Sequence, residues 1–422
     1  MQNKKTIYSW ALYDWANSAY ATTVMAGFFP LFFKTYYSSE VNATTSTAQL
    51  GFANSISSLL LVLIIPLLGA IADKFSFKKR FLFTFAYLGI IMSLALSFVS
   101  QGNWQIAIFI YVLANIGFLG SNTFYDALLP SVSEEKNVDF VSSLGFSLGY
   151  LGGGILFAIN IWMVKDFGFF GFENEAEAIK ASFLSVALWW AIFSMPILFF
   201  IKEEKKKKIG TLKALKDGFE ALKNTLSKIK KLKGLLLFLV AYWLYIDGVN
   251  TIIRMSVDYG MAIGFKSSDL ILALLIVQFV GFPAALIFAK IAQAWDTKKA
   301  LFMAIGVYFF IVIWATMMDE TYEFYILAVM IALVQGGIQA LSRSYYSKMI
   351  PHNHSAEFFG FYNILGKFAA ILGPMLIAFM ALVTQDSRMA IASISLFFVV
   401  GAILLYFVDE KKIALETRRE LC

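Results

Sequence analysis

Residues 81–125 have the sequence FLFTFAYLGIIMSLALSFVSQGNWQIAIFIYVLANIGFLGSNTFY, without a single Asp, Glu, Lys or Arg. About 20 apolar residues cross the ~30 Å hydrocarbon core of a bilayer as a helix, so this stretch can cross twice, with a polar turn at residues 100–105. Residues 41–72 form a second stretch without charges. Because backbone groups in hydrocarbon must form their hydrogen bonds internally, the sequence predicts an all-α integral membrane protein.

The composition of the whole chain agrees with this prediction. Of 422 residues, 59% are hydrophobic and 15% are charged, and the mean hydropathy is +0.71. A soluble globule cannot hide that much apolar surface. The lone cysteine, Cys422, excludes a disulfide framework and a cysteine-based metal site.

Apolar stretches along the chain predict twelve spans. They lie at roughly 8–36, 48–72, 81–100, 104–129, 140–163, 180–201, 235–259, 269–293, 299–317, 322–349, 357–383 and 388–408. We therefore expect a six-helix bundle over residues 1–201, a linker over 202–233, and a second six-helix bundle with a short tail over 234–422.

Basic residues gather in the loops at one end of these spans. They precede span 1 and follow spans 2, 6, 8, 10 and 12, whereas the opposite loops are neutral or acidic, as at Glu173 and Glu175. The positive-inside rule then places both termini in the cytoplasm. It also accounts for the net charge of +7 without a nucleic-acid partner.

The linker Lys202–Lys233 is the longest polar segment, and four lysines in a row occupy positions 205–208. Leucine and phenylalanine recur in it at helical spacing. This pattern predicts an amphipathic helix that binds anionic lipid at the membrane surface. The alternative is a solvated linker whose lysines only enforce the topology.

The two bundles carry matching motifs at a nearly constant offset. Asp73 with Lys78 and Lys79 ends span 2, and Asp296 with Lys298 and Lys299 ends span 8. A Tyr and a Pro five residues later close both spans 4 and 10, and Asp139-Phe and Glu357-Phe open spans 5 and 11. A duplicated six-helix unit is a transporter architecture, with the solute site between the halves.

The stretch Gly69-Ala-Ile-Ala-Asp73-Lys74, followed by Lys78 and Lys79, resembles the signature loop between helices 2 and 3 of the major facilitator superfamily. The resemblance implies that Gly69 allows close helix packing and that Asp73 with Lys74, Lys78 and Lys79 forms a conformational latch. The chain departs from the pattern because Ser76 stands at the usual glycine position and the basic residues are displaced by one.

Three further motifs resemble the family that contains the fungal vacuolar amino-acid effluxer linked to autophagy. They are Tyr13-Asp14-Trp15-Ala16-Asn17-Ser18-Ala19-Tyr20, residues 335–344 (QGGIQALSRS) and residues 357–362 (EFFGFY). The resemblance implies efflux of amino acids or related small solutes. The compact chain looks prokaryotic, which would place it in the plasma (inner) membrane.

Polar side chains inside the apolar spans are the candidates for the solute site, because burying them in a bilayer is costly. At 100° per residue they form stripes on spans 1, 4, 7 and 10, which the resemblance makes cavity-lining helices. The candidates for substrate binding or coupling are Asp14, Asn17, Asn115, Asn122, Asp247, Asn250, Arg254, Gln335, Gln339, Asn363 and Lys367. The alternative is interhelical hydrogen bonding that only holds the bundle together.

Depth along the helices groups the charged candidates into two sets. Asp14, Asp126 and Arg343 lie roughly 6 to 12 Å from the cytoplasmic ends of their spans, so we expect an inner gate. Asp247 and Lys367 lie roughly 15 to 18 Å deep and are expected to pair near mid-membrane. A static ion pair at the helix interface is the alternative for that second set.

The motifs of catalysis are missing from the sequence. It has no Ser/His/Asp arrangement, phosphate loop or dinucleotide fingerprint, so we expect no enzyme and no cofactor. His352 and His354 have no third ligand in view, so no metal site is predicted. The favoured function is a monomeric secondary transporter of a small solute, with protons as a candidate coupling ion. The alternative is a non-transporting receptor on the same fold.

Overall fold

The computed structural model describes residues 4–40, 43–203, 219–220, 232–262, 267–318, 320–368, 372–385 and 387–421. Every regular element in these ranges is helical. The first half comprises α1 (Lys4–Ala19), η1 (Tyr20–Phe28), α2 (Phe29–Phe32), η2 (Phe33–Tyr37), α3 (Ala43–Phe75), α4 (Lys78–Leu96), α5 (Trp104–Val132), α6 (Val138–Lys165), α7 (Glu175–Phe193) and α8 (Met195–Phe200). The second half comprises α10 (Lys233–Ala262), α11 (Ser267–Trp295), α12 (Thr297–Ala315), α13 (Thr321–Met349), η3 (His352–His354), α14 (Ser355–Phe368), α15 (Leu372–Thr384), α16 (Ser387–Ala392), α17 (Ser395–Tyr406) and α18 (Glu410–Leu421).

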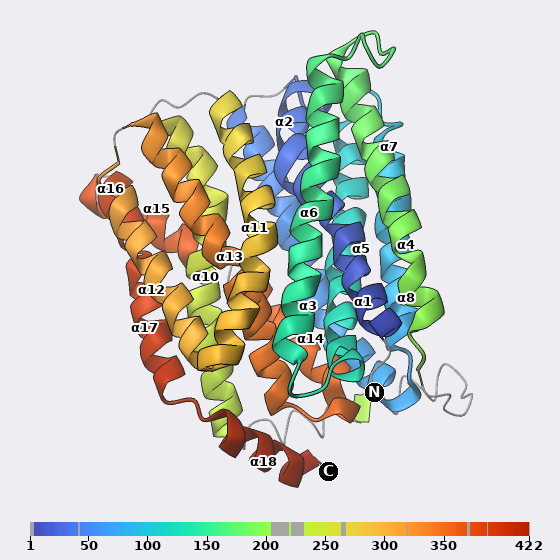
Figure 1. The fold of residues 1–422 in the computed structure, drawn as a ribbon. Helices are drawn as coiled ribbons and strands as arrows, with labels where there is room; N and C mark the ends of the chain where they lie inside the picture. The colour runs from blue at the N-terminus through green and yellow to red at the C-terminus, as the bar shows by residue number, and fades with distance from the viewer. Residues whose placement is uncertain are drawn as a thin grey trace.

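Ten helical segments in the described ranges are long and apolar enough to cross a membrane. The segment from α1 to η2, and α14 with α15, bring the number of crossings to the twelve that the sequence predicts. Figure 1 shows the helices running side by side, with the two chain termini at the same end of the bundle. We call this end the terminal end and the other the opposite end.

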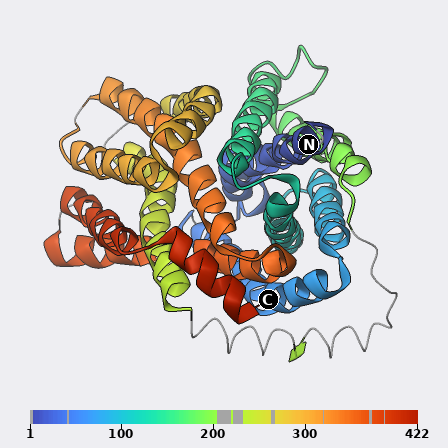
Figure 2. The ribbon, with the colours of Figure 1, turned by 60° about the horizontal axis from the view of Figure 1, so that its bottom comes forward.

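The helices form two groups that face each other. Helices α1–α8 make the N-terminal bundle and α10–α17 make the C-terminal bundle, and α18 lies across the terminal end (Figure 2). The bundles touch mainly where α6 packs against α11 and α13, and where α14 packs against α3 and α5. The prediction of two six-helix bundles in an all-α membrane protein is confirmed.

Three spans differ from the simple helices that were predicted. The first contains two π-helical stretches, η1 and η2, inside what hydropathy presents as one helix. The sixth, predicted over 180–201, breaks at Ser194 into α7 and α8. Pro196 follows the break and has no N–H to donate, so α8 starts a new hydrogen-bonding series there. The twelfth, predicted over 388–408, is interrupted at residues 393–394 between α16 and α17.

Glycines allow the backbones of α1 and α6 to approach closely. A Cβ added at Gly149 would lie 2.6 Å from Ser18 Oγ, and one at Gly152 would lie 2.6 Å from the Trp15 carbonyl oxygen. Side chains at these positions would force the two helices apart. The close packing of α6 against α1 therefore fixes the orientation of α1 beside it.

The start of the linker is bonded to α4. The Glu203 carboxylate accepts hydrogen bonds from the backbone N–H groups of Lys78 and Lys79, both at 3.0 Å, at the N-terminus of α4. A carboxylate at this end of a helix accepts from amides that have no partner within the helix. Its negative charge also interacts favourably with the positive end of the helix dipole. The predicted surface helix over 202–233 falls almost wholly outside the described residues, so it stays a prediction.

Candidate functional site

A cavity of about 480 Å³ lies between the two bundles. Its walls come from α1, η1, α5 and α6 on one side and from α10–α14 and α16 on the other. Among its described lining residues, only Asp14, Asp126 and Arg343 carry a formal charge. The volume suits a small solute, because pockets for drug-sized ligands begin at roughly 300 Å³.

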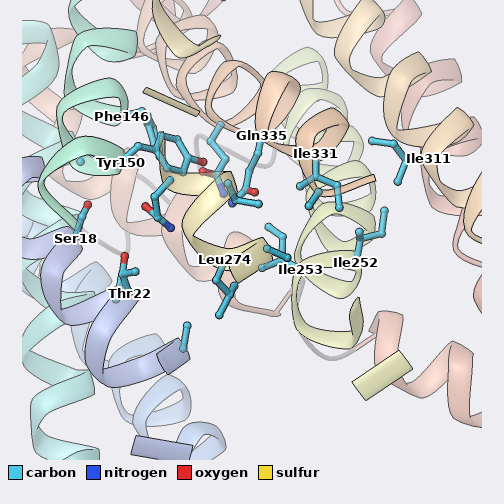
Figure 3. Close-up of a pocket in the computed structure, with 18 of the residues that line it drawn as sticks. Ser18, Thr22, Phe146, Tyr150, Ile252, Ile253, Leu274, Ile311, Ile331 and Gln335 are labelled. Atoms are coloured by element: carbon cyan, nitrogen blue, oxygen red, sulfur yellow. The ribbon is translucent and has the colours of Figure 1, made fainter. Parts of the chain in front are cut away.

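The walls of this cavity differ in chemistry. The polar wall carries hydroxyl and amide groups, including Ser18 and Thr22 from the first span and Tyr150 from α6. The apolar wall belongs to the C-terminal bundle and contains Ile252 and Ile253 together with Leu274, Ile311 and Ile331. Figure 3 shows the two sets on opposite sides, with Gln335 between them. The cavity can therefore hold a polar group at one side and an apolar group at the other.

Arg343 closes the floor of the cavity with two carboxylates. Its Nη1 lies 2.9 Å from Asp126 Oδ1 and 3.8 Å from Asp14 Oδ2, and its other donors reach Ser142 Oγ and the Ser142 carbonyl, each at 2.9 Å. Asn363 donates to the other Asp126 oxygen at 3.0 Å. We call these five residues the Arg343 cluster. It joins the bundles, because Arg343 and Asn363 come from the C-terminal one.

Three aromatic rings of the N-terminal bundle surround the Arg343 guanidinium. Its central carbon lies 4.4 Å from the ring centre of Phe146, 4.9 Å from that of Trp10 and 5.4 Å from that of Tyr125. Trp10 and Tyr125 are stacked 4.3 Å apart. Cations are attracted to aromatic faces at such distances. Arg343 is thus held by charge, hydrogen bonds and rings, and only 3% of it is exposed.

A second connection between the bundles lies at Asp73, and we call it the Asp73 contact. The Asp73 carboxylate accepts hydrogen bonds from the backbone N–H groups of Ala356 and Glu357 at 3.1 and 2.9 Å, at the N-terminus of α14. Lys78 Nζ lies 2.9 Å from Asp73 and donates to Ser355 Oγ at 2.7 Å. Gly69 makes this approach possible, since an added Cβ would lie 2.7 Å from the Ala356 carbonyl oxygen.

A third connection, the Asp139 contact, is built from side chains. Asp139 Oδ2 lies 2.8 Å from Lys348 Nζ and accepts a hydrogen bond from Thr297 Oγ1 at 2.9 Å, while Ser344 donates to Oδ1. Lys348 also donates to Thr297 at 2.7 Å. Asp139 belongs to α6, and its three partners belong to the C-terminal bundle.

All three connections lie toward the terminal end. The cavity starts at the Arg343 cluster and extends the other way, since its lining includes Met318, between α12 and α13, and Phe324, in the first turn of α13. These three charged connections therefore lie on one side of the cavity. α6 and α11 also pack beside the cavity, where Ser147 Oγ donates to the Phe282 carbonyl at 2.8 Å.

The structure brings most of the predicted site residues to this cavity. Six of the binding candidates line it, together with the predicted gate residues Asp126 and Arg343. The six are Asp14, Asn17, Asn122, Gln335, Gln339 and Asn363. Asn17 donates a hydrogen bond to Asn122 across the α1–α5 interface.

Three candidates lie behind the lining. Asn115 is buried and bonds to Tyr20 and Asn54. Asp247 is fully buried and accepts from the Gly373 N–H at 3.2 Å and from Thr251 at 3.3 Å. Asn250 donates to the Gly366 carbonyl at 3.4 Å.

The side chains of Arg254 and Lys367 lie outside the described residues, so the predicted Asp247–Lys367 pair stays a prediction. Among the predicted latch residues, Lys79 donates to the Ile201 carbonyl at 2.6 Å and Lys74 lies over the Phe75 ring. The Lys79 partner lies at the end of the N-terminal bundle.

Sequence reasoning missed Tyr150, Phe146 and Gln278 in the cavity and the whole Asp139 contact. The internal repeat could have indicated that contact, because Asp139 and Glu357 open corresponding spans and α14 already meets Asp73. No cluster of three or more His, Cys, Asp or Glu side chains in the described ranges could hold a metal ion.

Comparisons with known proteins agree on one kind of protein. The family model described as "Vacuole effluxer Atg22 like" matches residues 40–139 and 131–418. An MFS-type transporter of Bacillus subtilis (strain 168), YxiO, is 41% identical, with 96% of this chain and 94% of the relative covered. Autophagy-related protein 22 of Saccharomyces cerevisiae (strain ATCC 204508 / S288c) is 21% identical, with 97% and 92% covered.

Solved structures with similar folds are major facilitator transporters. The proton:xylose symporter XylE bound to 6-bromo-6-deoxy-D-glucose has a TM-score of 0.73 at 13% identity, with 96% of this chain and 95% of that one covered. FucP in the outward conformation has a TM-score of 0.70 at 11% identity, with 96% and 99% covered. These two likenesses concern the fold alone.

Proposed function

Because this chain belongs to the Atg22-like vacuole effluxer family and has the major facilitator fold, it is a multi-pass membrane transporter and not an enzyme, and we propose that it exports a small amphipathic solute such as an amino acid by alternating access. The observation that carries this proposal is the cavity between the bundles, bounded on one side by the Arg343 cluster.

The two walls of the cavity support an amphipathic solute. A zwitterion would place its charged groups against the polar wall and its side chain against Ile252, Ile253 and Ile331. Uncharged amides from Gln335 and Gln339 can donate to a carboxylate without adding charge to the membrane interior. A purely apolar solute would leave these buried polar groups without partners, which is unfavourable.

The three connections between the bundles support a gate at the terminal end. In this proposal the Arg343 cluster and the Asp73 and Asp139 contacts hold that end closed, and all three separate when the bundles rock about the cavity. Gly69, Asp73 and Lys78 form the latch across the bundles. Lys79 and Glu203 fasten the linker to α4, and Lys74 contributes to the basic surface of the terminal end.

We place the terminal end in the cytoplasm of a prokaryotic cell, because the basic loops gather there. In a variant without Cys422, Glu175→Cys should be labelled by an impermeant thiol reagent on intact cells, and Lys208→Cys should not. The reverse pattern would overturn this topology. The binding of anionic lipid by Lys202–Lys233 and the monomeric state stay predictions.

Transport into proteoliposomes tests the function. Radiolabelled amino acids and sugars are screened with and without a pH gradient, since Asp14 and Asp126 line the cavity and are candidate proton carriers. We expect counterflow of at least one amino acid, faster when protons move against it. Failure of every solute to exchange, in a preparation that is folded, would contradict the proposal.

A further inference from the structure

The floor of the cavity holds more negative than positive charge. Of the described lining residues, Asp14 and Asp126 are acidic and Arg343 alone is basic. Removing a charge from water without a counter-charge costs several kcal/mol, so a surplus carboxylate inside a membrane protein must acquire a cation or a proton. The question is which of the two carboxylates carries the surplus.

The hydrogen bonds identify Asp14 as the surplus carboxylate. Asp126 is bonded at both oxygens, because Arg343 and Asn363 donate to them at 2.9 and 3.0 Å. Asp14 Oδ2 accepts from the Tyr125 hydroxyl at 3.1 Å and lies 3.8 Å from Arg343, which is too far for a good hydrogen bond. Asp14 Oδ1 accepts from no donor in the part of the chain that the structure describes, and Asp14 lines the cavity.

The Arg343 guanidinium is not available to an anion from the cavity. Its donors already reach Asp126, Ser142 Oγ and the Ser142 carbonyl, and the rings of Trp10 and Phe146 lie against it. A carboxylate approaching it would also meet Asp14 and Asp126. This corner of the cavity therefore repels anions and attracts cations.

We infer that Asp14 binds the ammonium group of the transported solute, and that this ammonium and the Arg343 guanidinium compete for the Asp14–Asp126 pair. The inference rests on the proposed function and names the group that the cavity recognises. Ser18, Asn17 and Tyr150 offer uncharged oxygens beside Asp14.

The competition would couple binding to the gate. Asp14 belongs to the N-terminal bundle, whereas Arg343 is docked into that bundle from α13. An ammonium at Asp14 lowers the negative potential that holds Arg343, so a bound solute favours separation of the bundles at the terminal end. A ligand shifts such an equilibrium only through a difference in its affinity for the two states, and this competition supplies one.

The test uses three probes that share one alkyl chain: norleucine, its decarboxylated analogue pentylammonium, and its deaminated analogue hexanoate. Binding to the purified full chain is measured from the shift in its unfolding temperature with probe concentration. We expect norleucine and pentylammonium to bind and hexanoate not to bind. Hexanoate binding as tightly as pentylammonium would overturn the inference.

Two variants should change pentylammonium binding in opposite directions. Asp14→Asn should weaken it by about tenfold or more, because the carboxylate is lost, whereas Arg343→Gln should strengthen it, because the competitor is lost. A purely structural role for both residues would weaken binding in both variants. Glu134→Gln, which removes an exposed carboxylate in the loop after α5, is the matched control and should leave binding unchanged.

Arg343→Gln leaves Asp126 without its counter-charge and can fail to fold. The double variant Arg343→Gln/Asp126→Asn removes that problem and keeps Asp14, so it should still bind pentylammonium. Unchanged binding in Asp14→Asn, or no binding in the double variant, would refute the inference. Transport of hexanoate without pentylammonium binding would refute it and leave the proposed export of an amphipathic solute intact.

Discussion

Asp73 and Asp139 both reach from the N-terminal bundle to the C-terminal bundle, but they are bound in different ways. Asp73 accepts from two backbone N–H groups at the start of α14, whereas Asp139 is bound by the side chains of Lys348, Thr297 and Ser344. Backbone donors are present for any residue other than proline at positions 356 and 357. The Asp73 contact therefore depends on the approach of two backbones, and the Asp139 contact depends on the identity of its partners.

The two contacts occupy matching places in the internal repeat. Asp73 ends the second span and meets the start of the eleventh, while Thr297, which follows the eighth span and begins α12, meets Asp139 at the start of the fifth. The acid comes from the N-terminal bundle in both. Asp296, the counterpart of Asp73, makes no capping bond to α12 and has a φ of 135°. The duplication thus preserved the places where the bundles meet. The acidic residue, however, stands at the end of a span in the Asp73 contact and at the start of a span in the Asp139 contact.

The largest effect should follow loss of the Asp139 side chain. Asp139→Ala leaves the largely buried Lys348 without its carboxylate, which costs about 3 kcal/mol when a buried pair is broken. We expect the terminal end to open. Labelling of Ala340→Cys, in a variant without Cys422, measures this, because Ala340 is fully buried and its carbonyl accepts from Ser142.

The double variant Asp139→Leu/Lys348→Met is the control for that experiment. It removes both charges, so most of the loss should be recovered. Slow labelling of Ala340→Cys in Asp139→Ala would show that the side-chain contact contributes little.

The next largest effect should come from Gly69→Ala. The new Cβ would lie 2.7 Å from the Ala356 carbonyl, so α3 and α14 must separate, at a cost of about 2 kcal/mol. Labelling of Ala127→Cys reports this side, since Ala127 is buried and its carbonyl accepts from Ser355. Gly51→Ala is the control on the same helix, because nothing lies within 4 Å of a Cβ added there.

Asp73→Asn should have a smaller effect than the loss of Asp139. The amide oxygen can still accept from one backbone N–H, so the variant loses one bond and the charge beside Lys78, together about 1.5 kcal/mol. Transport turnover should fall by about tenfold, with folding and solute affinity little changed. Unchanged turnover would remove the latch role from Asp73.

Ser76→Gly should strengthen the same region slightly. Ser76 has a φ of 56° directly after α3, in the left-handed region that glycine adopts without strain, and the Phe77 N–H returns to the Ala72 carbonyl. We expect about 0.5 kcal/mol of added stability, seen as a higher unfolding temperature. A lower unfolding temperature would show that the Ser76 side chain has a role of its own.

The smallest effect should be a pH dependence confined to α18. Burial raises the pKa of Glu410 to about 7, with Asp139 and Asp296 adding to the shift and Lys348 opposing it. Since this value lies above that of a free glutamate, docking of α18 is weakest when Glu410 is charged and strengthens as the pH falls through 7. Hydrogen exchange of α18 between pH 8 and 6 measures this. Glu410→Gln should abolish the dependence, and the Asp73 contact should not respond.

Much of the fold could be predicted from the sequence because lipid leaves few alternatives. Twelve apolar stretches must be helices, and the loop charges and the internal repeat divide them into two bundles. The grouping of Asp14, Asp126 and Arg343 followed from their similar depth. Depth alone could not say that Asn115 bonds to Tyr20 behind the cavity, because it does not give the direction in which a side chain points.

The remaining differences have local physical causes. The break at Ser194 has a visible signal in Pro196, whereas the π-helical stretches of the first span have none. The Asp139 contact joins residues more than 150 positions apart, and each of its charges alone looks like part of a basic or acidic loop.

The π-helical stretch η1 has a consequence for the evolution of solute specificity. Its i→i+5 hydrogen bonds fit an extra residue into the turn, so it is the structural equivalent of an insertion into an α-helix. Deleting one residue between Tyr20 and Phe28 would restore α-helical spacing and turn everything before the deletion relative to everything after it. Thr22 and Ala26 line the cavity there. Loss of one codon would therefore change which side chains of the first span face the solute, without any substitution in the other helices that line the cavity.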